Sequence, residues 1–192
     1  MSTPPTLHAD ITEVLTRWTA PDIAQDALRH TVLAFLAARP DAHRRTCAPG
    51  HITASTVVLS ADRRRTLLTL HARVGRWLQL GGHLEDDATL ADAARREAVE
   101  ESGFEVTLDP DPVDLHCHPI VCKGYDAPTR HLDVRFVAVA PAGARERISE
   151  ESTDLRWFDV EALPDVPPEV ALLIGRAVAQ SETPSTRLPF SR

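Results

Sequence analysis

Residues 81–104 read GGHLEDDATLADAARREAVEESGF, and this stretch decides the fold that we expect. Thr89, followed by Asp92 three residues later, resembles a helix-capping box. Gly103 is a typical residue at the end of a helix. These two signals predict a helix over Thr89–Ser102.

Three glutamates of this helix lie where a helix in water would not place them. With about 100° between successive residues, Glu97 and Glu101 fall in the middle of the apolar stripe that starts at Leu90, and Glu100 lies at its border. Carboxylates clustered on a partly desolvated face repel one another, and a hard divalent cation such as Mg²⁺ removes that cost. Arg96 can pair with Glu100 four residues later. The alternative interpretation is a solvated acidic face.

Apolar periodicity predicts further helices and strands on both sides of this helix. Residues 7–39 read as two helices that Pro40 ends, and Glu169–Ala179 reads as a final helix. Strands are predicted at Ile52–Ser60, Thr66–His71, Trp77–Leu80, Phe104–Leu108, Val113–Val121, His131–Ala140 and Leu155–Phe158. Strands interleaved with helices indicate an α/β fold, an α/β/α sandwich with a mixed sheet covered on both sides.

These patterns divide the chain into three parts. Residues 1–50 are expected to be a helical extension, residues 51–180 the main domain, and residues 181–192 a disordered tail. With 192 residues, 43% of them hydrophobic, the chain can bury a core without disulfides, and its three cysteines contain no CxxC pair. Because Asp10 and Glu13 lie near the N-terminus without a long apolar run, we expect no signal peptide and a cytoplasmic protein.

The net charge of −7 limits the class of partner. Nucleic-acid polymers and anionic membrane surfaces require a basic surface, and no stretch approaches the ~18 apolar residues of a membrane span. We therefore expect a small-molecule substrate, no polymeric nucleic acid and no membrane. An anionic substrate would then need a metal or local basic groups, and Arg44 and Arg45 could reach such a site.

The quoted stretch resembles the Nudix box. That motif is a glycine, five residues, a glutamate, seven residues, then Arg-Glu, an apolar residue, any residue, Glu-Glu, any residue, a glycine and an apolar residue. The matching residues are Gly82, Arg96, Glu97, Glu100, Glu101, Gly103 and Phe104. The chain departs from the motif at Ala88, where the family has its first glutamate. The sequence is thus similar to Nudix hydrolases of the MutT-like and ADP-ribose pyrophosphatase-like kind.

The resemblance implies both a fold and a reaction. In the family, the residues matching Glu97, Glu100 and Glu101 bind divalent metal, Mg²⁺ or Mn²⁺, and Arg96 holds the cluster in place. The reaction is hydrolysis of a nucleoside diphosphate linked to a further group. Ala88 leaves the number of metal ions open, and Asp86 or Asp87 could supply a nearby carboxylate.

The resemblance also implies a general base for the attacking water. Many members use a glutamate in the loop before the last strand, ahead of a tryptophan. Here that residue is Glu151, six residues before Trp157, with Glu150 adjacent. The alternative is a surface acidic pair.

Polar side chains on two predicted strands suggest a substrate-binding wall. His116 and His118 project to one side of their predicted strand, and His131 and Asp133 project to one side of the next predicted strand. We expect a pocket wall that recognises phosphate or base, with a solvated strand face as the alternative. His83, next to Gly82, could meet phosphates or cap a turn. A zinc site formed by His116, Cys117, His118 and Cys122 is not expected, because neighbouring strand residues face opposite ways.

Two other functions remain open at this level. One is an isopentenyl-diphosphate isomerase-like enzyme, whose chemistry requires a cysteine at the turn where this chain has glycine, in Gly81-Gly82-His83. A non-catalytic Nudix-like regulator would be expected to lose its box glutamates. The N-terminal helices could hold a partner or form a homodimer.

Overall fold

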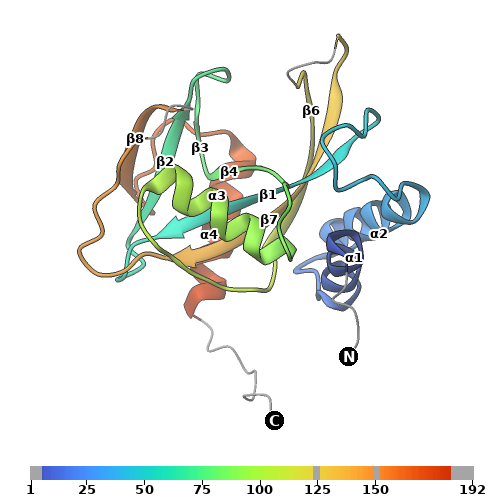
Figure 1. The fold of residues 1–192 in the computed structure, drawn as a ribbon. Coiled ribbons are helices and arrows are strands. Elements are labelled where there is room, and N and C mark those ends of the chain that lie inside the picture. The colour runs from blue at the N-terminus through green and yellow to red at the C-terminus, as the bar shows by residue number, and fades with distance from the viewer. Residues whose placement is uncertain (1–5, 123–125, 149–151, 183–192) are drawn as a thin grey trace.

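The computed structural model describes residues 6–122, 126–148 and 152–182 and contains four helices and eight strands within these ranges (Figure 1). The helices are α1 (Leu7–Arg17), α2 (Ile23–Ala38), α3 (Leu90–Ser102) and α4 (Pro168–Glu182). The strands are β1 (His51–Leu59), β2 (Arg65–His71), β3 (Trp77–Leu78), β4 (Leu80–His83), β5 (Thr107–Leu108), β6 (Asp114–Ile120), β7 (Thr129–Val139) and β8 (Ser152–Asp159). The predicted α/β class with a mixed sheet is confirmed.

One sheet contains all eight strands, and β1 is its central element. β1 pairs in parallel with β7 over its whole length, from His51 opposite His131 to Leu59 opposite Val139. Its other edge pairs antiparallel with β2 and with β4. β6 extends the sheet beyond β7, and β8 extends it beyond β2. The first residues of β1 and β7 and the last residue of β4 therefore lie at the same end of the sheet.

Helices cover both faces of the sheet, which forms the expected sandwich (Figure 1). On one face, α3 packs with α1 and α2 against β1, β6 and β7, in a core that includes Leu90, Leu115 and Phe136. On the other face, α4 packs through Leu173 and Ile174. Burial of these apolar side chains stabilises the sandwich by about 1.5–3 kcal/mol per large residue.

The N-terminal helices share their core with the main domain. Ile11 and Leu15 of α1 are fully buried in the cluster that contains Leu90 of α3. The Asp10 carboxylate accepts a hydrogen bond of 2.7 Å from the Leu90 amide at the start of α3. The region that we predicted to be an extension therefore helps to position the glutamate helix.

The predicted limits of α3 agree with its caps. Thr89 is the N-cap, its hydroxyl accepting from the Asp92 amide at 3.0 Å, and Gly103 ends the helix in the left-handed conformation with φ 80°. At the other end of the chain, α4 continues to Glu182, past residue 181, where we placed the start of the tail. Among the described residues, none of the helices combines the length and apolarity needed to cross a membrane.

Candidate active site

The three box glutamates differ in exposure in the way that the helical wheel predicts. Glu101 is buried, and the side chain of Glu97 is 13% exposed. The side chain of Glu100 is 59% exposed, which agrees with its place at the border of the buried stripe. The helix therefore presents two sheltered carboxylates and one open carboxylate along a single edge.

Arg96 organises the acidic residues around α3. Its guanidinium donates two hydrogen bonds to Asp87, of 2.9 and 3.1 Å, and contacts Glu97 at 2.9 Å and Glu100 at 3.2 Å. It also donates to the His83 carbonyl at 3.0 Å. The bonds to Asp87 are the main cause that raises the pKa of Arg96 further above its usual value. A cation fixed in this way restricts the orientation of the carboxylates around it.

The two glycines before the helix allow the carboxylates to approach β4. The Gly81 amide donates to Glu101 Oε2 at 3.0 Å, and a Cβ at Gly81 (φ 149°) would lie only 2.4 Å from Ser55. A Cβ at Gly82 would lie 2.6 Å from Glu97 Oε2. Side chains at either position would therefore displace groups of the site or of β1, which explains why glycine occupies both positions.

A pocket of about 470 Å³ opens over these groups. It is lined by Arg45, Gly82, His83, Leu84, Glu85, Arg96, Glu97, Glu100 and Glu101. The acidic side chains outnumber the two arginines, so the pocket favours a cation. Arg45 supplies positive charge at the wall of this pocket. The sequence alone allowed Arg45 to reach the site but did not predict this position.

Asp87 is a carboxylate next to Ala88, the position where the Nudix box has its first glutamate, and it is hydrogen-bonded to Arg96. Ala88 is exposed and does not line the pocket. Burial disfavours the charged form of Asp87, but the hydrogen bonds from Arg96 and from the Glu85 amide, together with the charge of Arg96, outweigh it and lower the pKa of this carboxyl. Asp87 thus stays ionised as the partner of Arg96, while Asp86 is exposed.

The histidines and the aspartate predicted on β6 and β7 do pair across these strands, but none of them lines this pocket. His116 lies opposite Asp133 and His118 opposite His131. The Asp133 carboxylate accepts hydrogen bonds from Thr53 at 2.9 Å, Ser55 at 2.7 Å and Arg135 at 3.1 Å. Asp133 is thereby bound within a buried polar network, and neither it nor these histidines is among the residues that line the carboxylate pocket.

One group of metal-ligand type was missed by sequence reasoning. The side chains of His51, His83, Cys122 and His131 meet at the pocket wall that His83 lines, with their ligand atoms within 4.8 Å of one another. Burial lowers the pKa of His83 to about 4 and that of His131 to about 3, so these rings are neutral near pH 7. The four residues follow no zinc spacing pattern. The register that places His51 opposite His131 would have been needed to find them.

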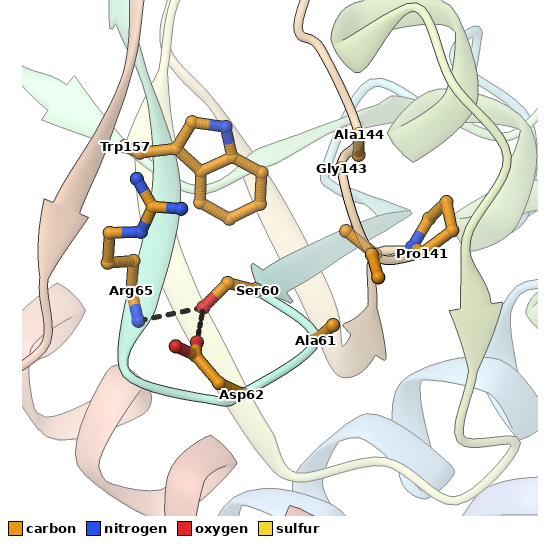
Figure 2. A pocket seen from close by; sticks show the side chains of 10 residues that line it. Ser60, Ala61, Asp62, Arg65, Pro141, Gly143, Ala144 and Trp157 are labelled. Carbon is orange, nitrogen blue, oxygen red and sulfur yellow. Dashed lines mark hydrogen bonds between the residues drawn. The ribbon is translucent and has the colours of Figure 1, made fainter.

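Figure 2 shows a second pocket, of about 300 Å³, near the other end of β1. Ser60 and Asp62 of the β1–β2 turn line it, together with Trp157 of β8. The Arg65 guanidinium lies 5.6 Å from the centre of the Trp157 ring. No box glutamate lines this pocket, so it is separate from the carboxylate site.

The predicted base, Glu151, and its neighbour Glu150 lie outside the described residues. The strand that follows them, β8, begins at Ser152, which pairs with His71 at the end of β2.

The geometry around α3 agrees with what comparison of the chain with known proteins finds. Residues 49–178 match the NUDIX domain family. The chain belongs to the Nudix family. The box residues of this chain lie on β4, on α3, on the loop between them and directly after α3, and Arg96 of α3 makes its contacts with the carboxylates there.

Relatives and solved structures support the same assignment. The Nudix chain is 32% identical over 114 residues to the oxidized purine nucleoside triphosphate hydrolase of Danio rerio, which covers 57% of this chain and 67% of that protein. A Nudix hydrolase structure from Clostridium perfringens is 23% identical, with a TM-score of 0.53, covering 69% of this chain and 98% of that one. The C. elegans Ap4A hydrolase is 18% identical, with a TM-score of 0.55, covering 68% and 96%.

Because the two structures are less than 25% identical to this chain, they show its fold alone. The family and its hydrolase relatives identify the protein as a Nudix hydrolase acting on phosphoanhydride bonds. Hydrolysis is therefore favoured over the isomerase-like and regulator alternatives.

Proposed function

We propose that this Nudix hydrolase cleaves the diphosphate linkage of a small nucleoside diphosphate derivative, using Mg²⁺ or Mn²⁺ held by Glu97, Glu100 and Glu101. The observation that carries the proposal is the convergence of these carboxylates, oriented by Arg96, in one open pocket. The intact glutamates support catalysis over a purely regulatory role.

The residues of the pocket fit a hard divalent cation. All the donors are carboxylate oxygens, which Mg²⁺ and Mn²⁺ prefer. Gly82 leaves space in front of the Glu97 carboxylate that any side chain would fill. When bound, such an ion neutralises phosphate charge and orients the attacking water.

The protein groups have separate tasks in this proposal. Arg96 holds Glu97 and Glu100 in place, so the carboxylates need little reorganisation when the substrate binds. Arg45, at the pocket wall, pairs with the phosphates of the substrate. Glu151 accepts the proton of the attacking water through its carboxylate. Water adds to one phosphorus, the bridging P–O bond breaks, and two phosphate-containing products leave.

The substrate class follows from the charge of the protein and from its relatives. The net charge of −7 disfavours polymeric nucleic acid and favours small soluble substrates. The relative from Danio rerio is named for oxidised purine nucleoside triphosphates, and the C. elegans neighbour for Ap4A. We extend both classes to this chain as candidates, together with ADP-ribose. His83 at the pocket wall is proposed to contact the substrate, with His116, His118, His131 and Asp133 as more distant candidates.

The experiment is a substrate panel with chromatographic separation of the products. The purified full chain is incubated with an oxidised purine nucleoside triphosphate, Ap4A or ADP-ribose, in Mg²⁺ or Mn²⁺. A nucleoside monophosphate, which lacks an anhydride bond, is the control. We expect cleavage of at least one anhydride and none of the monophosphate. Folded protein that cleaves no anhydride with either metal would contradict the proposal.

A further inference from the structure

The side chains of three histidines converge on one cysteine beside the carboxylate pocket, whose wall includes one of them, His83. Cys122 Sγ lies 3.2 Å from His131 Nε2, 3.6 Å from His83 Nε2 and 3.7 Å from His51 Nε2. Cys122 and His51 are buried, and His131 is 9% exposed. The chain thus brings four soft or borderline metal donors together, three of them buried and the fourth, His83, half-buried at the pocket wall.

The Cys122 sulfur is the common partner of all three imidazoles. The Cys122 thiol has one proton and can donate to only one of the three nitrogens. His51 Nδ1 lies 3.4 Å from the Cys47 carbonyl, which can only accept, so Nδ1 carries the proton and Nε2 presents a lone pair to the sulfur. The His51 lone pair and the Cys122 sulfur therefore face each other in a buried space. A bound cation would accept this lone pair together with the thiolate and the nitrogens of His83 and His131.

The nitrogen–sulfur distances fit a tetrahedral zinc site. Zinc binds histidine nitrogen at about 2.0–2.1 Å and cysteine sulfur at about 2.3 Å, and a tetrahedron with these bonds separates nitrogen from sulfur by about 3.6 Å. The three observed separations of 3.2, 3.6 and 3.7 Å cluster around that value. The His51–Cys47 contact is of the kind that orients a metal-binding imidazole through its other nitrogen.

We propose that His51, His83, Cys122 and His131 bind a structural Zn²⁺ ion, distinct from the divalent metal of the carboxylate pocket. Four protein ligands leave no open position, which is typical of structural zinc. Cys122 binds as the thiolate, and its proton leaves to solvent. The ion joins β1, β4 and β7 to Cys122, two residues beyond the end of β6.

This site has a direct consequence for the neighbouring pocket. His83 provides one ligand with its ring, and its backbone carbonyl accepts from Arg96. Its neighbour Gly82 lies against Glu97. The zinc site would therefore hold the wall of the carboxylate pocket.

The first test measures metal content by mass spectrometry of the purified full chain after growth with zinc. We expect about one zinc per chain in the wild type. Cys122→Ser should weaken zinc binding by at least ~10²-fold, because even partners outside the ligand shell contribute 10–100-fold. Cys117→Ser is the matched control, since Cys117 is exposed on the adjacent strand β6, and it should retain the wild-type zinc content.

The second test uses Co²⁺ in the chelator-treated wild type, so it does not depend on the folding of Cys122→Ser. Tetrahedral Co²⁺ with a thiolate ligand gives strong d–d bands and a sulfur-to-cobalt charge-transfer band. We expect both in the wild type and in Cys117→Ser, and their loss when Zn²⁺ is added. A wild type without zinc and without the charge-transfer band would overturn the proposal. So would Cys122→Ser with wild-type zinc content, or copper or iron at this site in place of zinc.

Discussion

The carboxylate of Glu97 lies directly against Gly82, so closely that a Cβ at residue 82 would stand 2.6 Å from Glu97 Oε2. Gly82→Ala must therefore move the carboxylate, while β4 itself can accept alanine. We expect kcat to fall by about 10²-fold, the usual cost of misplacing a catalytic group by about 1 Å. Steady-state turnover is the measurement.

Gly175→Ala is the control for this substitution. Gly175 lies in α4 with nothing within 4 Å of its Cβ position. Alanine there should leave kcat unchanged and raise the free energy of unfolding by about 0.5–1 kcal/mol, because it favours the helix. If Gly82→Ala keeps full activity, Glu97 does not need the position that the structure gives it.

The contact between Asp10 and the start of α3 predicts a loss of stability without a loss of chemistry. Asp10→Ala removes the acceptor of the Leu90 amide. The free energy of unfolding should fall by about 0.5–2 kcal/mol, as for other lost helix caps, with kcat nearly unchanged. Urea unfolding measures this change. Glu13→Ala, at an exposed residue of α1, the helix that carries Asp10, should lower the free energy of unfolding much less. Equal losses in the two variants would show that the Asp10 contact does not stabilise the protein.

The proposed base predicts a difference between two neighbouring glutamates. Glu151→Gln should lower kcat by ~10²–10⁴, the usual range for loss of a general base, with little change in the Mg²⁺ concentration for half-maximal rate. Glu150→Gln should have much less effect. If only Glu150 matters, our alignment of this loop is off by one. If neither matters, Glu100 at the pocket becomes the first candidate.

His116 predicts a dependence of stability on pH. Burial, followed by the charge of Arg135, lowers its pKa to about 4, although Asp133 and Glu169 act in the opposite direction. The unfolded chain, with an ordinary histidine pKa of about 6.5, binds the proton first as pH falls. The His116 contribution to stability is therefore present above pH 6.5 and decreases between pH 6.5 and pH 4.

His116→Asn should remove this part of the acid sensitivity. Between pH 7 and pH 5, the variant should lose less unfolding free energy than the wild type, as measured by urea unfolding. His30→Asn, at an exposed residue of α2, should behave as the wild type does. Identical losses in the wild type and His116→Asn would exclude the predicted role of His116.

Much of the fold was predictable because the signals are local. The Thr89 cap and Gly103 predicted the limits of α3, and the wheel placed Glu97 and Glu101 on its sheltered side. The continuation of β4 through Gly81 and Gly82 was missed, because glycine has no strand preference of its own. Its pairing there comes from the backbone of β1.

The features that escaped prediction depend on contacts between distant residues. Asp10 meets Leu90, 80 residues later, and no local pattern predicts that contact. Arg45 reaches the pocket from the loop before β1. The histidine–cysteine group requires the register of β1 with β7, and Asp133 needed its partners Thr53 and Ser55 to show that it lies in a buried network.

The proposed function requires the α3 carboxylates for metal-dependent hydrolysis. The most direct measurement is the turnover number of chelator-treated protein at saturating Mg²⁺, with the anhydride that the panel identifies. Glu100→Gln and Glu101→Gln are compared with the wild type. Glu105→Gln is the control, since Glu105 is exposed and pairs only with Arg95 among the contacts that the described residues make.

We expect no turnover without added metal and a fall of at least ~10²-fold in both variants, with the fold intact by circular dichroism. Glu105→Gln should retain the wild-type rate. Turnover that survives removal of metal, or wild-type rates in both Glu100→Gln and Glu101→Gln at saturating Mg²⁺, would contradict the account.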